Sequence, residues 1–272
     1  MSKIQIKVNE KEAAVTTGTT LSQVRTQYKA DSDVIILNGA PCADDPLLAD
    51  GDTVVLIKKG EVPTHAQLEA LMYSRHTPGV HDKIKNAVIG VAGAGGLGSS
   101  IAVALVRVGI GKLIVADFDV VEPSNLNRQQ YFVSQIGMRK VDALKENLER
   151  INPYVSIEAH SIRLIPENIS EIFSGINIML EAFDKADQKA MLAETFRSTF
   201  PDIPFVGSSG MAGYYSSNLI KTVKISENFY IVGDLVNAAG PGEGLMAPRV
   251  GVASHHQANC ALRILLGFKD EE

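Results

Sequence analysis

Residues 87–106 read AVIGVAGAGGLGSSIAVALV and give the strongest indication of the fold. This stretch is apolar or small throughout and is about long enough to be mistaken for a membrane span. Its glycines instead indicate a buried strand, a tight turn and a buried helix. Gly93, Gly95 and Gly98 form a G-x-G-x-x-G pattern at that turn. Glycines there let backbone N–H groups at the helix start approach a phosphate or a ribose, so the pattern by itself serves NAD and ATP equally.

Strand patterns alternate with helical patterns from residue 86 onwards. The strand candidates are residues 87–92, 112–117, 155–160, 177–183 and 203–208. This alternation predicts an α/β fold in which helices cover both faces of a mostly parallel sheet. Residues 86–272 are therefore predicted to form one domain.

The first 60 residues predict a second, smaller domain. Residues 3–8 alternate polar and apolar side chains, a turn and a returning strand follow, and Thr20 is placed to cap a short helix. Residues 33–39 and 50–58 add two apolar strands. The order strand, strand, helix, strand, strand resembles the β-grasp fold of ubiquitin-like sulfur carriers such as ThiS.

The end of this small domain differs from that of such carriers. Sulfur carriers end in a free Gly-Gly whose carboxylate is activated, whereas here Gly60 stands alone and the chain continues. We therefore do not expect residues 1–60 to act as an activatable tail. Residues 61–85 are helix-like and mixed in polarity, which predicts a helical connector.

The composition excludes several kinds of partner. Lys and Arg number 26 against 31 Asp and Glu, a net charge of −5, so no broad cationic face for a nucleic-acid backbone is expected. Cys42 and Cys260 lie far apart and cannot form a paired CxxC zinc site, and no secretory start is visible. We therefore expect a cytoplasmic protein that binds neither nucleic acid nor membrane and holds no zinc.

Two acidic residues stand at the end of the second strand candidate of the large domain. Asp117 follows the apolar run and Asp119 comes two residues later. A carboxylate at this position can accept hydrogen bonds from ribose hydroxyls. The alternative is a strand-end carboxylate that caps a turn, and it stays open for both residues.

The loop SNLNRQQ, residues 124–130, favours ATP over NAD. A nicotinamide enzyme has no phosphoryl chemistry that would require a cationic, amide-rich loop beside its nucleotide. An enzyme that cleaves a triphosphate needs donors around it, and Arg128 with the side-chain amides of Asn125 and Gln129 would provide them. Lys140 opens the next helix and could add a positive charge.

Six motifs in this order resemble the ThiF/MoeB/HesA family, relatives of ubiquitin-activating enzymes that adenylate the C-terminal glycine of a ubiquitin-like protein. They are GAGGLGSS, DFDVVEPSNLNRQ, IGMRKVDA, INP, EAFD and GLMAPRVGV. The resemblance covers roughly residues 70–267, and the ThiS-like start of the chain resembles a ThiF subfamily with a fused N-terminal domain. It implies a Rossmann-like ATP-binding domain and a nucleotidyltransferase that uses ATP and Mg²⁺.

The resemblance also implies roles for individual residues. Those implied to bind the nucleotide are Gly93, Gly95, Gly96, Gly98, Asp117, Asp119, Asn125 and Gln129. Those implied to take part in catalysis are Arg128, Lys140, Asp184 and Arg75.

Two of these catalytic assignments carry further expectations. Asp184 matches the family position that helps to hold Mg²⁺ or orients the triphosphate, and its alternative role is a cap for the helix that begins at residue 185. Arg75 resembles the family's N-terminal arginine that reaches into the ATP site of the partner subunit. If this match holds, the active enzyme is a homodimer.

The leading hypothesis is an adenylyltransferase for a ThiS-type sulfur carrier in the formation of the thiazole part of thiamine. Many relatives carry a cysteine in the crossover loop, but none occurs between Gly207 and Pro248, so the chain is expected to stop at adenylation. The alternatives are activation of another carrier or of a tRNA or peptide carboxylate, a carrier-binding scaffold regulated by the fused β-grasp domain, and an NAD oxidoreductase.

Overall fold

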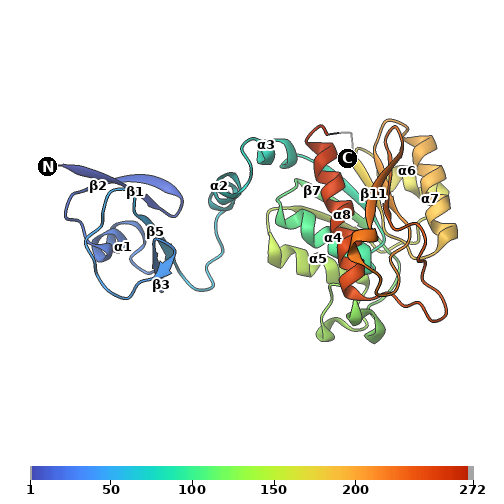
Figure 1. Cartoon of the computed structure of the whole chain (residues 1–272), viewed down its shortest axis with the longest axis horizontal. Helices are drawn as coiled ribbons and strands as arrows, with labels where there is room; N and C mark the ends of the chain where they lie inside the picture. The colour runs from blue at the N-terminus through green and yellow to red at the C-terminus, as the bar shows by residue number, and fades with distance from the viewer. Residues whose placement is uncertain (1, 269–272) are drawn as a thin grey trace. The chain divides into compact units, whose positions relative to one another are not determined.

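The computed structural model describes residues 2–268, which fold into two compact units (Figure 1). Unit 1 extends to Thr77 and unit 2 begins at Pro78. The division falls inside the segment 61–85 that the sequence assigns to a connector. The domain boundaries at residues 60 and 85 stay a prediction, and the outer ends of the first and last domains, at residues 1 and 269–272, lie outside the described residues.

Unit 1 contains a β-grasp fold, as the order of its elements predicts. Its five-stranded sheet has the order β2-β1-β5-β3-β4, with β1 and β5 parallel at the centre. The elements are β1 (Lys3–Val8), β2 (Lys11–Thr16), α1 (Leu21–Lys29), β3 (Val34–Leu37), β4 (Ala40–Pro41), β5 (Thr53–Ile57) and α2 (His65–Arg75). Thr20 caps α1 together with Gln23, and Leu21 and Val24 bury the helix against the sheet.

Unit 2 is built on a seven-stranded sheet with the order β11-β12-β10-β9-β6-β7-β8. The strands are β6 (Val88–Ala92), β7 (Lys112–Ala116), β8 (Ser156–His160), β9 (Ile178–Glu181), β10 (Phe205–Ser208), β11 (Lys221–Ser226) and β12 (Phe229–Gly233). All pair in parallel except β11, which runs antiparallel to β12. The α/β prediction is confirmed, and the β11–β12 hairpin is an element that the sequence analysis missed.

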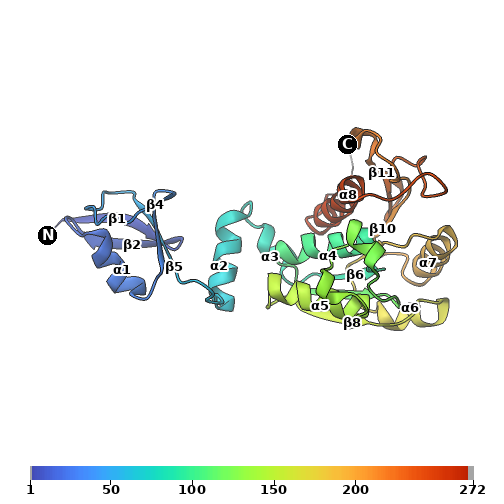
Figure 2. The same ribbon diagram turned by 90° about the horizontal axis from the view of Figure 1, so that it is seen from below.

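Helices cover both faces of this sheet. They are α3 (Val80–Ile84), α4 (Gly96–Arg107), α5 (Lys140–Ile151), α6 (Pro166–Ile172), α7 (Ala186–Thr199) and α8 (Ala247–Leu265), with short 3-10 turns at η1 (Pro123–Asn127), η2 (Val133–Gln135) and η3 (Ser217–Leu219). Helices α4, α5 and α8 share one apolar core with the sheet. Helices α6 and α7, which lie side by side (Figure 1, Figure 2), share the other.

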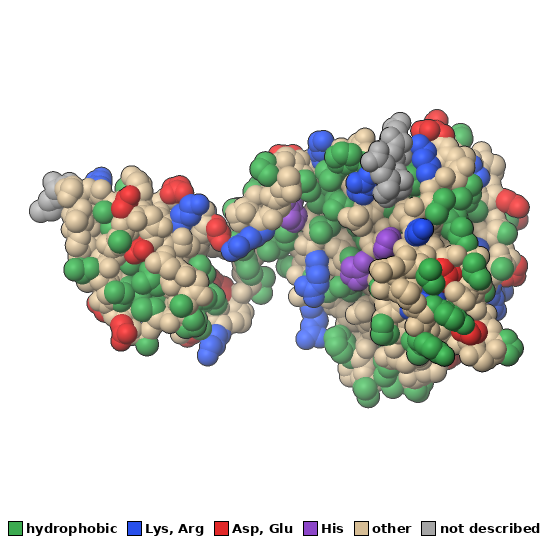
Figure 3. All heavy atoms as spheres, in the orientation of Figure 1, with side chains coloured by type: hydrophobic (Ala, Val, Ile, Leu, Met, Phe, Trp, Pro, Cys, Tyr) green, Lys and Arg blue, Asp and Glu red, His purple; other side chains and the backbone are tan. Residues whose placement is uncertain are grey.

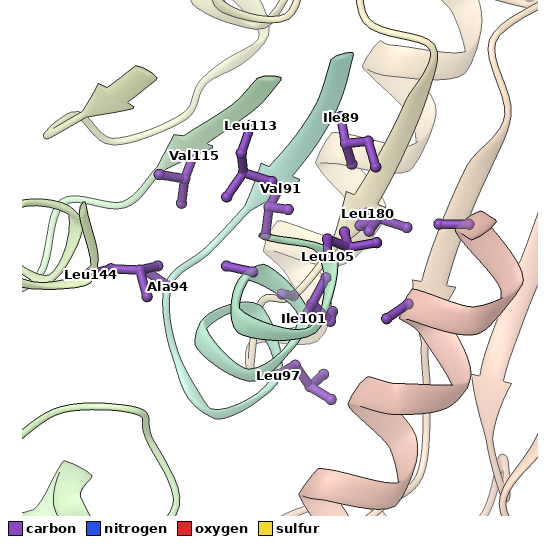
Figure 4. Packing of buried hydrophobic residues seen from close by; sticks show 14 of the residues in the cluster. Ile89, Val91, Ala94, Leu97, Ile101, Leu105, Leu113, Val115, Leu144 and Leu180 are labelled. Atoms are coloured by element: carbon purple, nitrogen blue, oxygen red, sulfur yellow. The ribbon is translucent and has the colours of Figure 1, made fainter. Parts of the chain in front are cut away.

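The larger core lies between the central strands and α4. Figure 4 shows Ile89 and Val91 of β6 beside Ile101 and Leu105 of α4, and all four side chains are fully or almost fully buried. The stretch that resembles a membrane span in its composition therefore forms a central strand and a packed helix. No helix between residues 2 and 268 is both long and apolar enough to cross a membrane.

The face of unit 2 that Figure 3 shows carries charged side chains of both signs. Figure 3 shows basic, acidic and apolar side chains together on the visible face of this unit. This distribution agrees with the nearly balanced number of charges in the sequence.

The order of the strands fixes where a ligand can bind. The chain passes from β6 outward to β7 and β8, and then returns to place β9 on the other side of β6. In open parallel sheets, such a reversal of strand order leaves a crevice outside the carboxyl ends of the strands. The loops that follow β6 and β9 therefore border the expected binding crevice.

Candidate functional site

A cavity of about 750 Å³ lies at the carboxyl ends of the strands of unit 2. This volume suits a cofactor or a nucleotide. The loops after β6, β7, β9, β10 and β12 all contribute to its lining. The lining includes these residues from the sequence analysis: Gly93, Gly95, Gly96, Asp117, Asp119, Asn125, Arg128, Gln129, Lys140 and Asp184.

Two residues from the sequence analysis lie elsewhere. A Cβ atom on Gly98 would approach the carbonyl oxygen of Gly93 to 1.9 Å, so Gly98 serves the close packing of α4 against the turn and does not line the cavity. Arg75 lies in α2 of unit 1, where its side chain is 75% exposed and forms an ion pair of 2.8 Å with Glu10. Its action in the site of a partner subunit stays a prediction.

Asp117 holds the glycine turn in place. Its Oδ2 accepts a hydrogen bond from the backbone N–H of Ala94 at 2.7 Å, and its Oδ1 accepts one from that of Asp119 at 2.8 Å. Burial raises the pKa of the Asp117 carboxyl above its ordinary value, and these two hydrogen bonds partly offset the rise. The hydrogen bond from Asp119 is the turn cap that the sequence analysis gave as the alternative role. Each carboxylate oxygen of Asp117 still has a lone pair for a ribose hydroxyl.

Tyr131 supports the same turn from the other side. Its hydroxyl donates to the carbonyl of Ala94 at 2.6 Å. Burial, together with the charges of Asp117 and Asp119, raises the pKa of this hydroxyl, so it stays protonated and remains a donor. Both the N–H and the C=O of Ala94 are therefore fixed, and Gly93, Gly95 and Gly96 of the same turn line the cavity.

The SNLNRQQ loop places a cation beside the glycines. Asn125 accepts a hydrogen bond from the backbone of Glu122 through Oδ1, which shapes η1 and leaves its amide nitrogen for a ligand. The aliphatic part of Arg128 lies 3.3 Å from the position of a Cβ atom on Gly96, and its guanidinium donates to Asn127 Oδ1 at 2.8 Å. Within residues 2–268, no carboxylate forms an ion pair with Arg128, so its charge is available to an anion.

Gln129 brings a buried polar group without a partner to the cavity. Its side chain is 8% exposed and lines the cavity, yet its Oε1 has no hydrogen-bond partner among the described residues. An unsatisfied buried acceptor costs about 1–3 kcal/mol, so a bound molecule that donates a hydrogen bond here would remove this cost.

The positive charge of Lys140 is balanced by a neighbouring carboxylate. The side chain of Lys140 is 8% exposed, and its ammonium forms an ion pair of 2.8 Å with Asp119. A positive charge at a helix N-terminus is unfavourable, and Asp119 offsets this cost. Most of the charge of Lys140 is therefore balanced within the protein.

Asp184 lies exposed in the loop between β9 and α7. The residue that caps α7 is Lys185, and no side-chain capping bond is formed, so Asp184 does not act as the helix cap. Within residues 2–268, no group of three or more His, Cys, Asp or Glu side chains is arranged to hold a metal ion. A metal at Asp184 would therefore need ligands from a substrate.

Further polar residues in the cavity were missed by the sequence analysis. They include Arg163, Lys185, Gln188, Lys189, Ser208, Ser209 and Asn237. Each lies at or after the end of a strand or near the start of α7, and this position at the carboxyl edge of the sheet could have identified them. Arg163 lies over the ring of Phe118, with 4.8 Å between its Cζ atom and the ring centre.

A buried ion pair supports the far wall of the cavity. Asp234 accepts from Arg249 at 2.5 Å, and both side chains are 4% exposed. The other guanidinium nitrogen of Arg249 donates to the carbonyl of Ala212, while Asp234 also accepts from Asn237. This pair therefore joins the loop after β10, the loop after β12 and the start of α8.

The stability of unit 2 should respond to acid through Asp234. Burial by itself would raise its pKa, but hydrogen bonds from Asn237, Arg249 and Val236 outweigh it and hold the pKa well below the ordinary value. A lowered folded-state pKa contributes stability above the unfolded-state value of about 3.9, and this contribution is lost as the pH falls through the folded-state pKa. The Asp234→Asn variant should be less stable than wild type by about 2 kcal/mol at pH 7, and the difference should shrink below about pH 4.

Urea unfolding across this pH range measures the effect. Asp202→Asn is the control because Asp202 is exposed and its carboxylate is not part of the ion pair. A difference between wild type and Asp234→Asn that does not change with pH would contradict the assignment.

Comparisons with known proteins agree with the two-unit organisation. Residues 69–272 match the model of the ThiF family, and residues 4–60 match that of the ThiS-like ubiquitin family. The chain is 33% identical over 194 residues to the adenylyltransferase and sulfurtransferase UBA4 of Eremothecium gossypii, which covers 68% of this chain and 43% of that protein. It is 36% identical over 123 residues to the probable adenylyltransferase/sulfurtransferase MoeZ of Mycobacterium tuberculosis, covering 43% and 31%. The chain thus spans less than half the length of these relatives.

A solved structure shares the fold. The E. coli tRNA N6-threonylcarbamoyladenosine dehydratase TcdA aligns with a TM-score of 0.67 at 21% identity, covering 76% of this chain and 98% of that one. The complex of the same protein with ATP aligns with a TM-score of 0.64 at 23% identity, over 76% and 97%. These likenesses show that unit 2 has the same fold.

Proposed function

Because this chain belongs to the ThiF family, we propose that it is an ATP-dependent adenylyltransferase acting on the C-terminal carboxylate of a ThiS-type sulfur carrier, in formation of the thiazole part of thiamine. One observation carries the proposal. A single cavity joins the glycine turn, the Asp117 carboxylate, the unpaired charge of Arg128 and the unsatisfied amide of Gln129. Asp117 suits a ribose, the glycine turn and Arg128 suit a chain of phosphates, and Gln129 suits a hydrogen-bond donor on the same molecule.

Electrostatics favour ATP over a nicotinamide cofactor. Arg128 keeps its charge available beside the glycine turn, and Lys185 adds an exposed ammonium at the N-terminus of α7. A helix N-terminus with cations around it attracts a polyanion. The ATP complex of E. coli TcdA and the names of UBA4 and MoeZ, which include adenylyltransferase, support this nucleotide.

The proposed reaction needs no general base. The carrier's α-carboxyl titrates near about 3.5 and is already ionised at neutral pH. One of its oxygens attacks the α-phosphorus of ATP, the bond from that phosphorus to the oxygen bridging to the β-phosphate breaks, and pyrophosphate leaves with that electron pair. The products are an acyl-adenylate and pyrophosphate, and Arg128 would lower the repulsion between the two anions.

Magnesium fits this site as an ion held mainly by the substrate. Asp184 is exposed at the cavity, and Mg²⁺ is usually bound by one or two carboxylates, several waters and substrate phosphates. Asp184 would hold the ion, which would neutralise charge on the triphosphate. Because no cysteine lies between Gly207 and Pro248, we expect the chain to stop at adenylation and to leave sulfur transfer to another protein.

The proposal is tested by ATP–pyrophosphate exchange with a ThiS-type carrier that ends in Gly-Gly. Exchange should require both the carrier and Mg²⁺, and it should disappear when the last glycine of the carrier is deleted. If a tRNA stimulates ATP–pyrophosphate exchange and the carrier does not, the proposed acceptor is wrong but the proposed adenylation chemistry stands. If ATP binds and no acceptor produces exchange, a carrier-binding scaffold becomes the better explanation.

A further inference from the structure

The carboxyl ends of β9 and β10 separate at the cavity. The β9–β10 ladder ends at the pair Leu180 and Val206, whereas β9 continues to pair with β6 as far as Glu181. β10 likewise continues to pair with β12 as far as Ser208. A fork therefore opens between the two strands at the end of β9, where the loop that carries Asp184 begins.

A buried ion pair fills this fork. Glu181 is 2% exposed, and Lys189 of α7 donates to both of its carboxylate oxygens, at 2.9 and 3.0 Å. Lys189 also donates to the hydroxyl of Ser208 at 2.8 Å, and Glu181 accepts from the backbone of Ser208 at 3.1 Å. The pair thus replaces the backbone ladder that the separated strands no longer form.

The opposite face of the fork is held as well. Gln257 of α8 is fully buried, and its Nε2 donates to the carbonyls of Glu181 and Val206 at 2.8 and 3.3 Å. Glu181 is therefore fixed through its side chain by α7 and through its backbone by α8. This arrangement leaves the end of β9 little freedom to move.

The hydrogen bonds of Lys189 decide what it can do. An ammonium has three protons, and the contacts to Glu181 Oε1, Glu181 Oε2 and Ser208 Oγ use all of them. Although Lys189 lines the cavity, it has no donor left for a phosphate. Its charge is also matched by that of Glu181.

Glu181 also holds the loop that carries Asp184 through a hydrogen bond. Its Oε1 accepts from the backbone N–H of Phe183 at 2.6 Å, one residue before Asp184. We infer that Lys189 is a positioning residue, which acts through Glu181 to hold the loop 182–185 so that Asp184 stays at the cavity. This inference rests on the proposed function, in which Asp184 serves the triphosphate.

Hydrogen exchange tests the positioning without any need for activity. In the Lys189→Met variant, backbone amides of a peptide covering residues 182–190 should exchange at least about tenfold faster than in wild type, and Lys189→Arg should restore protection. Lys145→Met is the matched control, because the side chain of Lys145 in α5 is 44% exposed and lies outside the cavity. If amide hydrogen exchange in Lys189→Met equals that of wild type, the inference is wrong. This readout holds even if the wild-type protein shows no ATP–pyrophosphate exchange activity.

Kinetics then separate positioning from direct contact. Lys189→Met should lower kcat of ATP–pyrophosphate exchange by about 10–100-fold, with little change in KM for ATP. The same substitution should have almost no further effect in an Asp184→Asn background, because the two residues act in one unit. Additive losses, or a raised KM with an unchanged kcat, would show that Lys189 does not act through Asp184.

A second variant guards against a failure to fold. Removing one partner of a buried ion pair leaves the other charge unpaired, whereas replacing both charges is far better tolerated. Glu181→Gln combined with Lys189→Met should therefore fold and still show faster amide exchange at residues 182–190. Wild-type protection in this double variant would also overturn the inference.

Discussion

Replacing Arg128 with alanine is expected to slow carrier-dependent ATP–pyrophosphate exchange by about 10²–10³-fold. Arg128 lines the cavity beside Gly96 and, within residues 2–268, has no carboxylate that balances its charge. Lys140 cannot replace it because its ammonium is paired with Asp119. The loss should appear mainly in kcat, since the charge matters most while the carboxylate approaches the α-phosphate.

Controls make this result interpretable. Arg150→Ala removes an exposed arginine of α5 outside the cavity, and it should leave exchange unchanged. Arg128→Lys keeps the charge but loses the planar fork, so an intermediate rate is expected. If Arg128→Ala retains more than about a third of the wild-type rate, the phosphate role of SNLNRQQ is wrong.

Replacing Gly98 with alanine is expected to destabilise unit 2 by about 3 kcal/mol or more. The new Cβ atom would lie 1.9 Å from the carbonyl oxygen of Gly93 and 2.8 Å from its carbon, and both are backbone atoms that cannot move aside alone. Helix α4 would have to separate from β6. The midpoint of thermal unfolding should therefore fall by roughly 10 °C for a domain of this size.

A second helical glycine provides the comparison. A Cβ atom on Gly251 of α8 would meet nothing within 4 Å. Alanine favours a helix over glycine by about 1 kcal/mol, so Gly251→Ala should keep or raise the midpoint. Equal midpoints for the two variants would contradict the close packing at Gly98.

The glycine motif predicted the fold well because its requirements are local. A strand, a turn and a helix must follow one another at fixed spacing, and residues 87–106 form them as β6 and α4. The motif could not say which glycine touches a ligand, since that depends on the packing of α4. Gly95 and Gly96 line the cavity, whereas Gly98 lies against the strand turn.

The buried ion pairs could not be predicted from the sequence. Glu181 and Lys189 form their ion pair where β9 and β10 separate at their ends. The sequence near these two residues does not show where the pairing of the strands ends. Asp234 and Arg249 lie in a loop and a helix whose contact depends on how α8 packs. Lys140 was correctly placed at the start of a helix, but its pairing with Asp119 required the fold of the loop between them.

The ion pair of Asp234 with Arg249 has a consequence for protein engineering. It joins the two ends of the segment 238–246, so a change of length within that segment should not move the strand or the helix. Closure entropy grows slowly with loop length, by about 0.6 kcal/mol for each doubling. Insertions at residues 241–242, which lie outside the cavity lining, should therefore be tolerated by the fold.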